Sequence, residues 1–183
     1  MIWVIVVIVV VLIIGLLFAR SYNSLVAKRN RVDTSWSHVE VQLQRRYDLI
    51  PNLVETVKGY AKHESETFER VVVARAAGQS ASTPAEQTQA DNLLTGALRQ
   101  LFAVAEDYPE LRASENFASL QEDLSDTENK VAVSRQIYND TVLTYNNAVQ
   151  QLPSNIVASV TGFTTREFYD AVDAADTAPE VSF

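Results

Sequence analysis

Two histidines are the side chains in this 183-residue sequence that are best suited to metal or acid–base chemistry. His63 and Glu64 resemble the start of a zinc-peptidase motif, but that motif needs a second histidine four residues after the first, and position 67 is Thr67. On a single straight helix, His38 and His63 would share a face but lie roughly 37 Å apart. We therefore predict that both are surface or helix-packing residues and that they share no metal ion.

A group of carboxylates in the second half of the chain is the other candidate for metal chemistry. Dinuclear metal sites in helical bundles typically add Glu-x-x-His pairs to their carboxylates, and neither histidine here follows a glutamate at that spacing. We therefore predict a solvated acidic face. The group consists of Glu122, Asp123, Asp126 and Glu128.

Other catalytic groups are missing from the sequence or isolated in it. The chain has no cysteine, which excludes a thiol nucleophile, a thiolate metal site and a disulfide framework. Its five glycines stand alone, so there is no phosphate-binding loop and no nucleophile elbow. The sequence predicts no catalytic residue, no cofactor and no metal site, and hence a protein that is not an enzyme.

Apolar residues recur every seven positions in the first part of the chain, which indicates the helix that would position some of these residues. The repeat predicts one long amphipathic helical track with coiled-coil-like packing. Pro51 interrupts the track, and because the repeat keeps its register there, we predict a kink, with a break between Asp48 and Pro51 as the alternative. The two rows are Tyr22, Arg29, Trp36, Leu43, Ile50, Val57, Glu64 and Val71, and Leu25, Val32, Val39, Arg46, Leu53, Tyr60, Thr67 and Ala74.

Three charged residues, Arg29, Arg46 and Glu64, occupy positions in these apolar rows. A charge in a helical seam is costly unless it is paired, so such a residue can fix the register or the choice of partner helix. For Arg46, a network with Asp48 and the acidic third helix is one interpretation. The alternative is that the stems pack while the charged groups reach water. We take Arg46, Asp48, Pro51 and Glu64 as candidates for a register or interaction site.

Four further helices follow from start and stop signals. Thr83, Pro84 and Glu86 predict a helix start that continues to about Asp107, with Leu94, Leu98, Leu101 and Ala105 on its apolar stripe. A third long helix should begin near Ser114, with a row of large residues and a row of small ones. After Pro153, a short helix around 155–160 should end at Gly162, and 165–174 should form a last short amphipathic helix. The rows are Phe117, Leu124, Val131, Tyr138, Tyr145 and Leu152, and Leu120, Thr127, Ser134, Thr141 and Ala148.

The first 19 residues contain no charged residue, and as a helix they would span roughly 28 Å, about the thickness of the hydrocarbon core of a bilayer. Bulky residues at the end of the run favour a retained anchor over a cleaved signal peptide. A buried core helix is the other alternative. Lys and Arg residues follow the run and none precedes it, which predicts an N-terminus outside and a cytoplasmic C-terminal domain. These membrane-proximal basic residues are Arg20, Lys28, Arg29 and Arg31.

Acidic residues predominate after Arg75, which disfavours nucleic acid as a partner. Several sequence blocks resemble the LemA family of bacterial membrane proteins, in matching order and spacing. They are YNSLV at 22–26, RRYDLIPNLVETVKGYAKHE at 45–64, ENFASLQEDLSDTEN at 115–129, YNDTVLTYN at 138–146, LPSNIVASVTGF at 152–163 and PEVSF at 179–183.

The resemblance implies a single anchor followed by a cytoplasmic antiparallel bundle of four main helices, and it supplies no catalytic residues. The family includes a protein of magnetosome membranes, and its members often accompany membrane-bound peptidases in genomes. We therefore predict an all-α protein with an anchor at 1–19, an elongated four-helix bundle at 20–163 and a short helix and tail at 164–183.

The function expected from these features is that of a non-enzymatic scaffold or assembly protein in the bacterial inner membrane. It would contact the lipid bilayer and associate with copies of itself. The alternative is an adaptor or regulator of a membrane peptidase in envelope quality control.

Overall fold

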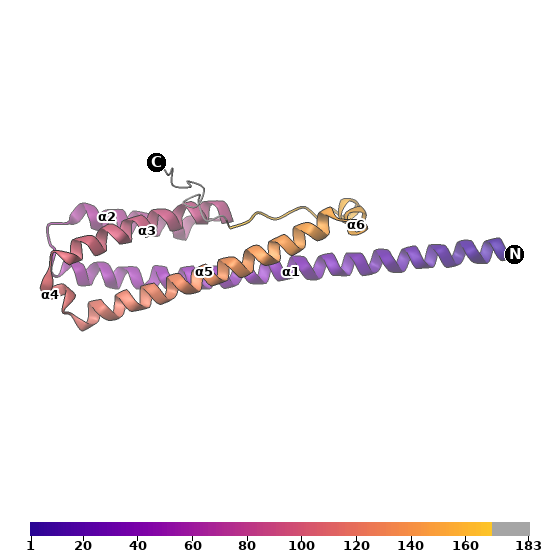
Figure 1. The fold of residues 1–183 in the computed structure, drawn as a ribbon. Coiled ribbons are helices and arrows are strands. Elements are labelled where there is room, and N and C mark those ends of the chain that lie inside the picture. The colour runs from indigo at the N-terminus through magenta and orange to yellow at the C-terminus, as the bar shows by residue number, and fades with distance from the viewer. Residues whose placement is uncertain (170–183) are drawn as a thin grey trace, which may run out of the picture. The chain divides into compact units, whose positions relative to one another are not determined.

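The computed structural model describes residues 1–169 and confirms the prediction of an all-α fold, since no strand occurs within them. The six helices are shown in Figure 1. They are α1 (Ile2–Lys58), α2 (Ser65–Ser80), α3 (Pro84–Glu106), α4 (Pro109–Arg112), α5 (Glu115–Gln150) and α6 (Ser154–Thr161).

The chain forms two compact units, and helices α1 and α5 contribute to both. The first unit consists of Met1–Ser37 and Gln136–Glu167, and the second contains His38–Arg135 together with Phe168 and Tyr169.

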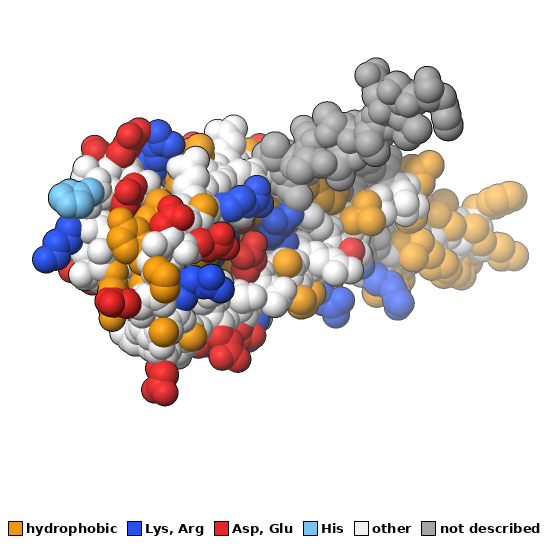
Figure 2. Space-filling view, turned by 60° about the vertical axis from the view of Figure 1, so that its left-hand side comes forward, with side chains coloured by type: hydrophobic (Ala, Val, Ile, Leu, Met, Phe, Trp, Pro, Cys, Tyr) orange, Lys and Arg blue, Asp and Glu red, His pale blue; other side chains and the backbone are white. Residues whose placement is uncertain are grey.

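The beginning of α1 is apolar and exposed to the surroundings. It contains an 18-residue window with a mean hydropathy of 3.5, of which 0% is buried. In Figure 2 this end of the molecule shows hydrophobic side chains without acidic or basic ones among them. A segment of this length and composition fits a single membrane crossing, and no other described helix passes the same test.

The rest of α1 passes through Pro51 without a reversal of direction and ends at Lys58, before Gly59. The prediction that one helical track continues to Ala74 was wrong, because α2 starts as a separate helix at Ser65. Tyr60 is 42% exposed, whereas Ala61 is fully buried, so the seven-residue register is lost at this connection.

Helix α3 begins as the sequence predicts. The Thr83 hydroxyl accepts a hydrogen bond from the Glu86 backbone at 3.2 Å, and the Glu86 carboxylate accepts one from the Thr83 backbone at 3.2 Å. Glu86 also accepts bonds from the Ser82 backbone and hydroxyl, and the backbone bond is the main cause of the lowered pKa of Glu86. This capping box satisfies amide groups that the first turn of a helix cannot pair internally.

Thr83→Ala is expected to lower the free energy of unfolding by about 1 kcal/mol, because it removes the acceptor for the Glu86 amide. Urea unfolding of the full-length protein in a neutral detergent, followed by far-UV circular dichroism, measures this loss.

The contribution of the Glu86 carboxylate to stability is fully present above the ordinary glutamate pKa and is lost as the pH falls through its lowered folded-state pKa. A Glu86→Gln variant should lack this pH dependence, and an unchanged pH profile would contradict the assignment.

The second unit packs parts of α1, α2, α3 and α5 against one another. In Figure 1, α2 and α3 run side by side. The predicted stripe of α3 is confirmed, since all four of its residues are buried, and Phe102 of α3 meets Phe117 of α5 at 6.2 Å between ring centroids. A count of four bundle helices and coiled-coil-like packing stay predictions.

The first unit packs α6 and the end of α5 against α1. Val157 and Ala158 of α6 are buried in one cluster with Leu25 of α1. The predicted stop of α6 is confirmed: Gly162 has φ of +76°, a conformation that glycine adopts without strain. Residues 163–169 are not helical, so the short helix expected at 165–174 is absent from its first part, and the remainder lies outside the described residues.

Candidate functional site

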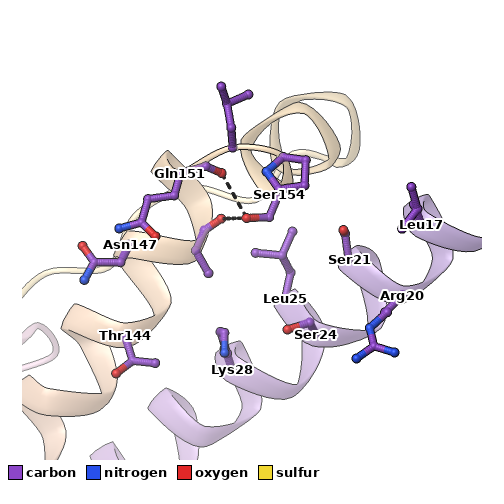
Figure 3. A pocket seen from close by; sticks show the side chains of 13 residues that line it. Leu17, Arg20, Ser21, Ser24, Leu25, Lys28, Thr144, Asn147, Gln151 and Ser154 are labelled. Atoms are coloured by element: carbon purple, nitrogen blue, oxygen red, sulfur yellow. Dashed lines mark hydrogen bonds between the residues drawn. The ribbon is translucent and has the colours of Figure 1, made fainter. Parts of the chain in front are cut away.

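A cavity of about 580 Å³ lies between α1 and the end of α5, where the apolar segment of α1 ends. Two of the predicted membrane-proximal cations, Arg20 and Lys28, line it from α1 (Figure 3). The α1 wall also carries Leu17, Ser21, Ser24 and Leu25, and the opposite wall carries Thr144, Asn147, Ala148, Gln151, Leu152, Pro153 and Ser154.

The lining of this cavity combines basic, polar and apolar side chains. It includes no acidic side chain, and within residues 1–169 no carboxylate forms an ion pair with Arg20 or Lys28. The Ser154 hydroxyl is already engaged, since it donates to the Ala148 carbonyl at 2.6 Å and lies 3.1 Å from that of Gln151 (Figure 3). The cavity therefore offers two cations with hydroxyl and amide groups around them.

The other two predicted basic residues lie outside the cavity. The Arg29 guanidinium stacks over the Phe163 ring at 5.2 Å from its centroid, and Tyr22 meets the same ring edge-on at 5.8 Å. Arg31 is exposed. Arg29 thus packs against Phe163 in the first unit.

The extended segment after α6 is fixed to α5 by side chains that the sequence did not single out for this role. Tyr138 and Tyr145 donate hydrogen bonds to the carbonyls of Glu167 and Thr164 at 2.9 and 2.8 Å. The Asn146 amide bonds both backbone groups of Arg166, at 2.9 and 2.8 Å. Burial raises the pKa of both tyrosines, which keeps their hydroxyls protonated as donors.

The second unit contains a buried ion pair. Arg46, which is 2% exposed, donates to the Asp91 carboxylate at 2.6 Å and to the Thr95 hydroxyl at 3.1 Å. Glu128 of α5 approaches Arg46 at 3.8 Å but is itself exposed. Burial raises the pKa of Asp91, and the positive charge of Arg46 opposes that shift. The pair therefore connects α1 and α3 across the interior of this unit.

The remaining candidates for a register site lie elsewhere. Asp48 is exposed and accepts a hydrogen bond from Gln44 at 2.7 Å, so it takes no part in the Arg46 contacts. Pro51 is an exposed residue inside α1, and Glu64 is the half-buried residue before α2, without a side-chain cap bond. That these residues set a register or partner stays a prediction.

Tyr47, next to Arg46 on α1, is held by contacts from two other helices, α2 and α3. Its hydroxyl accepts a hydrogen bond from Gln87 of α3, its carbonyl accepts one from Arg75 of α2 at 2.8 Å, and its ring lies against Gly78. Burial is the main influence that raises the pKa of Tyr47 to about 12. The sequence pattern gives no signal for these partners, because Gln87 and Arg75 are distant from Tyr47 in the chain.

A more apolar groove of about 640 Å³ lies between α2 and α3. Its floor includes the small residues Ala74, Ala77, Gly96 and Ala97, and Val73 and Leu93 beside it are 61% and 62% exposed. Glu66, Glu69 and Arg70 supply charges of both signs at its edge. A helix could approach closely over such a floor.

No group of three or more histidine, cysteine or acidic side chains that could hold a metal ion occurs in residues 1–169. His38 and His63 are exposed, as are all four members of the acidic group.

Comparison with known proteins decides the family. The sequence model of the LemA family matches residues 35–183 of this chain. The chain belongs to the LemA family. A second LemA-type sequence, "Protein LemA" of Metamycoplasma hominis, is 23% identical over 140 residues, covering 74% of this chain and 63% of the relative.

Magnetosome proteins are also among the LemA relatives. "Magnetosome protein MamQ 2" of Paramagnetospirillum magneticum is 29% identical over 182 residues, covering 85% of this chain and 67% of the relative. MamQ of Magnetospirillum gryphiswaldense is 27% identical over the same length and coverage. These names and the apolar start of α1 support a membrane-associated helical protein.

Proposed function

We propose that this protein is a non-enzymatic, membrane-anchored helical scaffold or assembly protein of the bacterial envelope. The observation that carries the proposal is the start of α1, which is apolar, unburied and continuous with the helix that packs in both units. Because α1 contains the apolar segment and continues without interruption into the folded domain, it would restrict the motion of that domain at the membrane surface. Membership of the LemA family and relatives named as magnetosome proteins support a membrane-associated role.

The proposed location is the inner membrane, with the N-terminus outside and the helical domain in the cytoplasm. Support comes from Arg20, Lys28 and Arg31, which follow the apolar segment closely. The acidic excess later in the chain would keep the rest of the domain away from an anionic membrane surface.

We also propose that copies associate through the groove between α2 and α3. A second copy fits this groove because its small floor permits close helix approach and its edge carries both Glu69 and Arg70, so a two-fold partner can place opposite charges together. The exposed Val73 and Leu93 would then be covered.

Introduced cysteines test this self-association, because the chain has none of its own. Leu93→Cys is expected to form a disulfide-linked dimer on mild oxidation of native membranes. Val133→Cys on α5 is the matched control, because Val133 is similarly exposed, at 57%, but lies outside the groove. This variant should stay monomeric. Gel mobility with and without reductant is the measurement.

Two other results would change the proposal. Monomer alone from both variants, with no second protein captured, would overturn self-association. A disulfide product between Leu93→Cys and a different protein would support the alternative role as an adaptor, and if that protein were a membrane peptidase, the quality-control function would replace the scaffold.

A further inference from the structure

The apolar surface next to the basic cavity is exposed although the sequence pattern assigns one of its residues to the core. Leu152 belongs to the large row of α5 but lies beyond the end of that helix at Gln150, and it is 75% exposed. Ile156 and Val160 of α6 are 57% and 72% exposed. These three side chains are defined here as the apolar collar.

The collar is attached close to the end of the membrane-spanning segment. Val157 and Ala158 on the inner side of α6 pack on Leu25 of α1. At 1.5 Å per residue, Leu25 lies about 9 Å along α1 from Ala19, the last residue of the apolar run. The headgroup layer begins at that boundary, so α6, which has no charged residue, is held where headgroups and upper acyl chains are found.

The cavity beside the collar has the chemistry of an anion site. It begins at Leu17, inside the apolar run, and reaches Lys28, so its lining changes from apolar to cationic along α1. Arg20 and Lys28 supply two positive charges, and Ser21, Ser24 and Asn147 supply neutral hydrogen-bonding groups. Its volume of about 580 Å³ is in the range of small-ligand sites.

We propose that this cavity binds the headgroup of one anionic phospholipid from the leaflet that α1 leaves at Arg20. The phosphate lies between Arg20 and Lys28, and the acyl chains pass Leu17 and contact Leu152 of the collar. A phospholipid combines a negative charge with an apolar tail at this depth. Arg20 and Lys28 offer positive charges to its phosphate, and Leu17 on α1 and Leu152 on the opposite wall offer apolar contacts to its tails. The inference rests on the proposed function only in that α1 spans the bilayer.

The test uses the full-length protein in a neutral detergent, with phosphatidylglycerol and phosphatidylcholine of identical acyl chains as probes and native mass spectrometry as the readout. The wild type should retain one phosphatidylglycerol in preference to phosphatidylcholine. Arg20→Gln with Lys28→Gln should weaken phosphatidylglycerol binding roughly 30-fold, since each cation near a headgroup contributes about one kilocalorie per mole. Leu152→Gln should weaken binding of both lipids.

Matched controls separate the cavity from net charge and from misfolding. Arg31→Gln with Arg45→Gln removes the same charge at exposed positions outside the cavity and should retain wild-type binding. Arg20→Lys with Lys28→Arg keeps both charges and should also bind. Equal loss in the Arg31 and Arg45 control, or no preference for phosphatidylglycerol in the wild type, would overturn the inference.

Two further experiments complete the test. The first distinguishes a lipid from a free anion as the ligand, and the second tests the membrane anchor independently of the cavity. Inorganic phosphate that displaces the lipid at equal concentration would assign a free-anion site in place of a lipid site. Membrane fractionation of the same cells reports the anchor: protein that stays in the membrane but shows no lipid preference refutes only the cavity inference, whereas protein found outside the membrane refutes the proposed function.

Discussion

Asp91→Ala is expected to lower the free energy of unfolding by about 3–5 kcal/mol, the largest loss predicted for a single substitution in this protein. The variant leaves the charge of Arg46, which is 2% exposed, with only the Thr95 hydroxyl at 3.1 Å and an exposed carboxylate 3.8 Å away. The uncompensated charge must be hydrated or neutralised, and either change disturbs the packing of α1 against α3. Thermal and urea unfolding in neutral detergent measure the loss.

The Asp126–Lys130 pair is a control for this prediction, because it has the same 2.6 Å separation as the Arg46–Asp91 pair but is solvated. Asp126 and Lys130 are 59% and 51% exposed, so Asp126→Ala should cost about 1 kcal/mol or less. A double variant, Arg46→Met with Asp91→Leu, should recover most of the loss, since it removes both buried charges. An Asp91→Ala loss no greater than that of Asp126→Ala would contradict the assigned role of burial.

The helices were largely predictable because burial leaves a periodic pattern and helix ends carry local signals. Thr83, Pro84 and Glu86 determine the start of α3 through contacts within one turn, which is why the expectation and the structure agree. The end of α1 was missed because the repeat reports which residues are buried and not the direction of the chain. Val57 and Val71 are both buried, although a connection separates their helices.

The contacts of the candidate sites were less predictable, because they join residues that are distant in the sequence. Arg46 stands out as a charge in an apolar row, yet Asp91 lies in a polar stretch that offers several other acceptors and donors. Only the packing of α3 on α1 selects it. The cavity also depends on tertiary structure, since Arg20 and Lys28 were visible as basic residues but their opposite wall comes from α5 and the residues after it.

The approach of α2 to α1 depends on the absence of a side chain at Gly78. A Cβ added there would lie 2.6 Å from Cζ of Tyr47 and still closer to its hydroxyl oxygen. The ring cannot move away easily, because Tyr47 is 3% exposed and bonded to Gln87 through its hydroxyl and to Arg75 through its carbonyl. Glycine at this position therefore permits the close contact.

Gly78→Ala is accordingly expected to lower the free energy of unfolding by about 1–3 kcal/mol through overpacking, despite the better helix propensity of alanine. Gly96→Ala on α3 is the matched control: an added Cβ there meets nothing within 4 Å, so this variant should gain up to about 1 kcal/mol. Combining Gly78→Ala with Tyr47→Phe removes the nearest atom and should recover part of the loss. Urea unfolding of the four proteins provides the comparison, and equal effects of alanine at both glycines would show that Tyr47 does not restrict the position of α2.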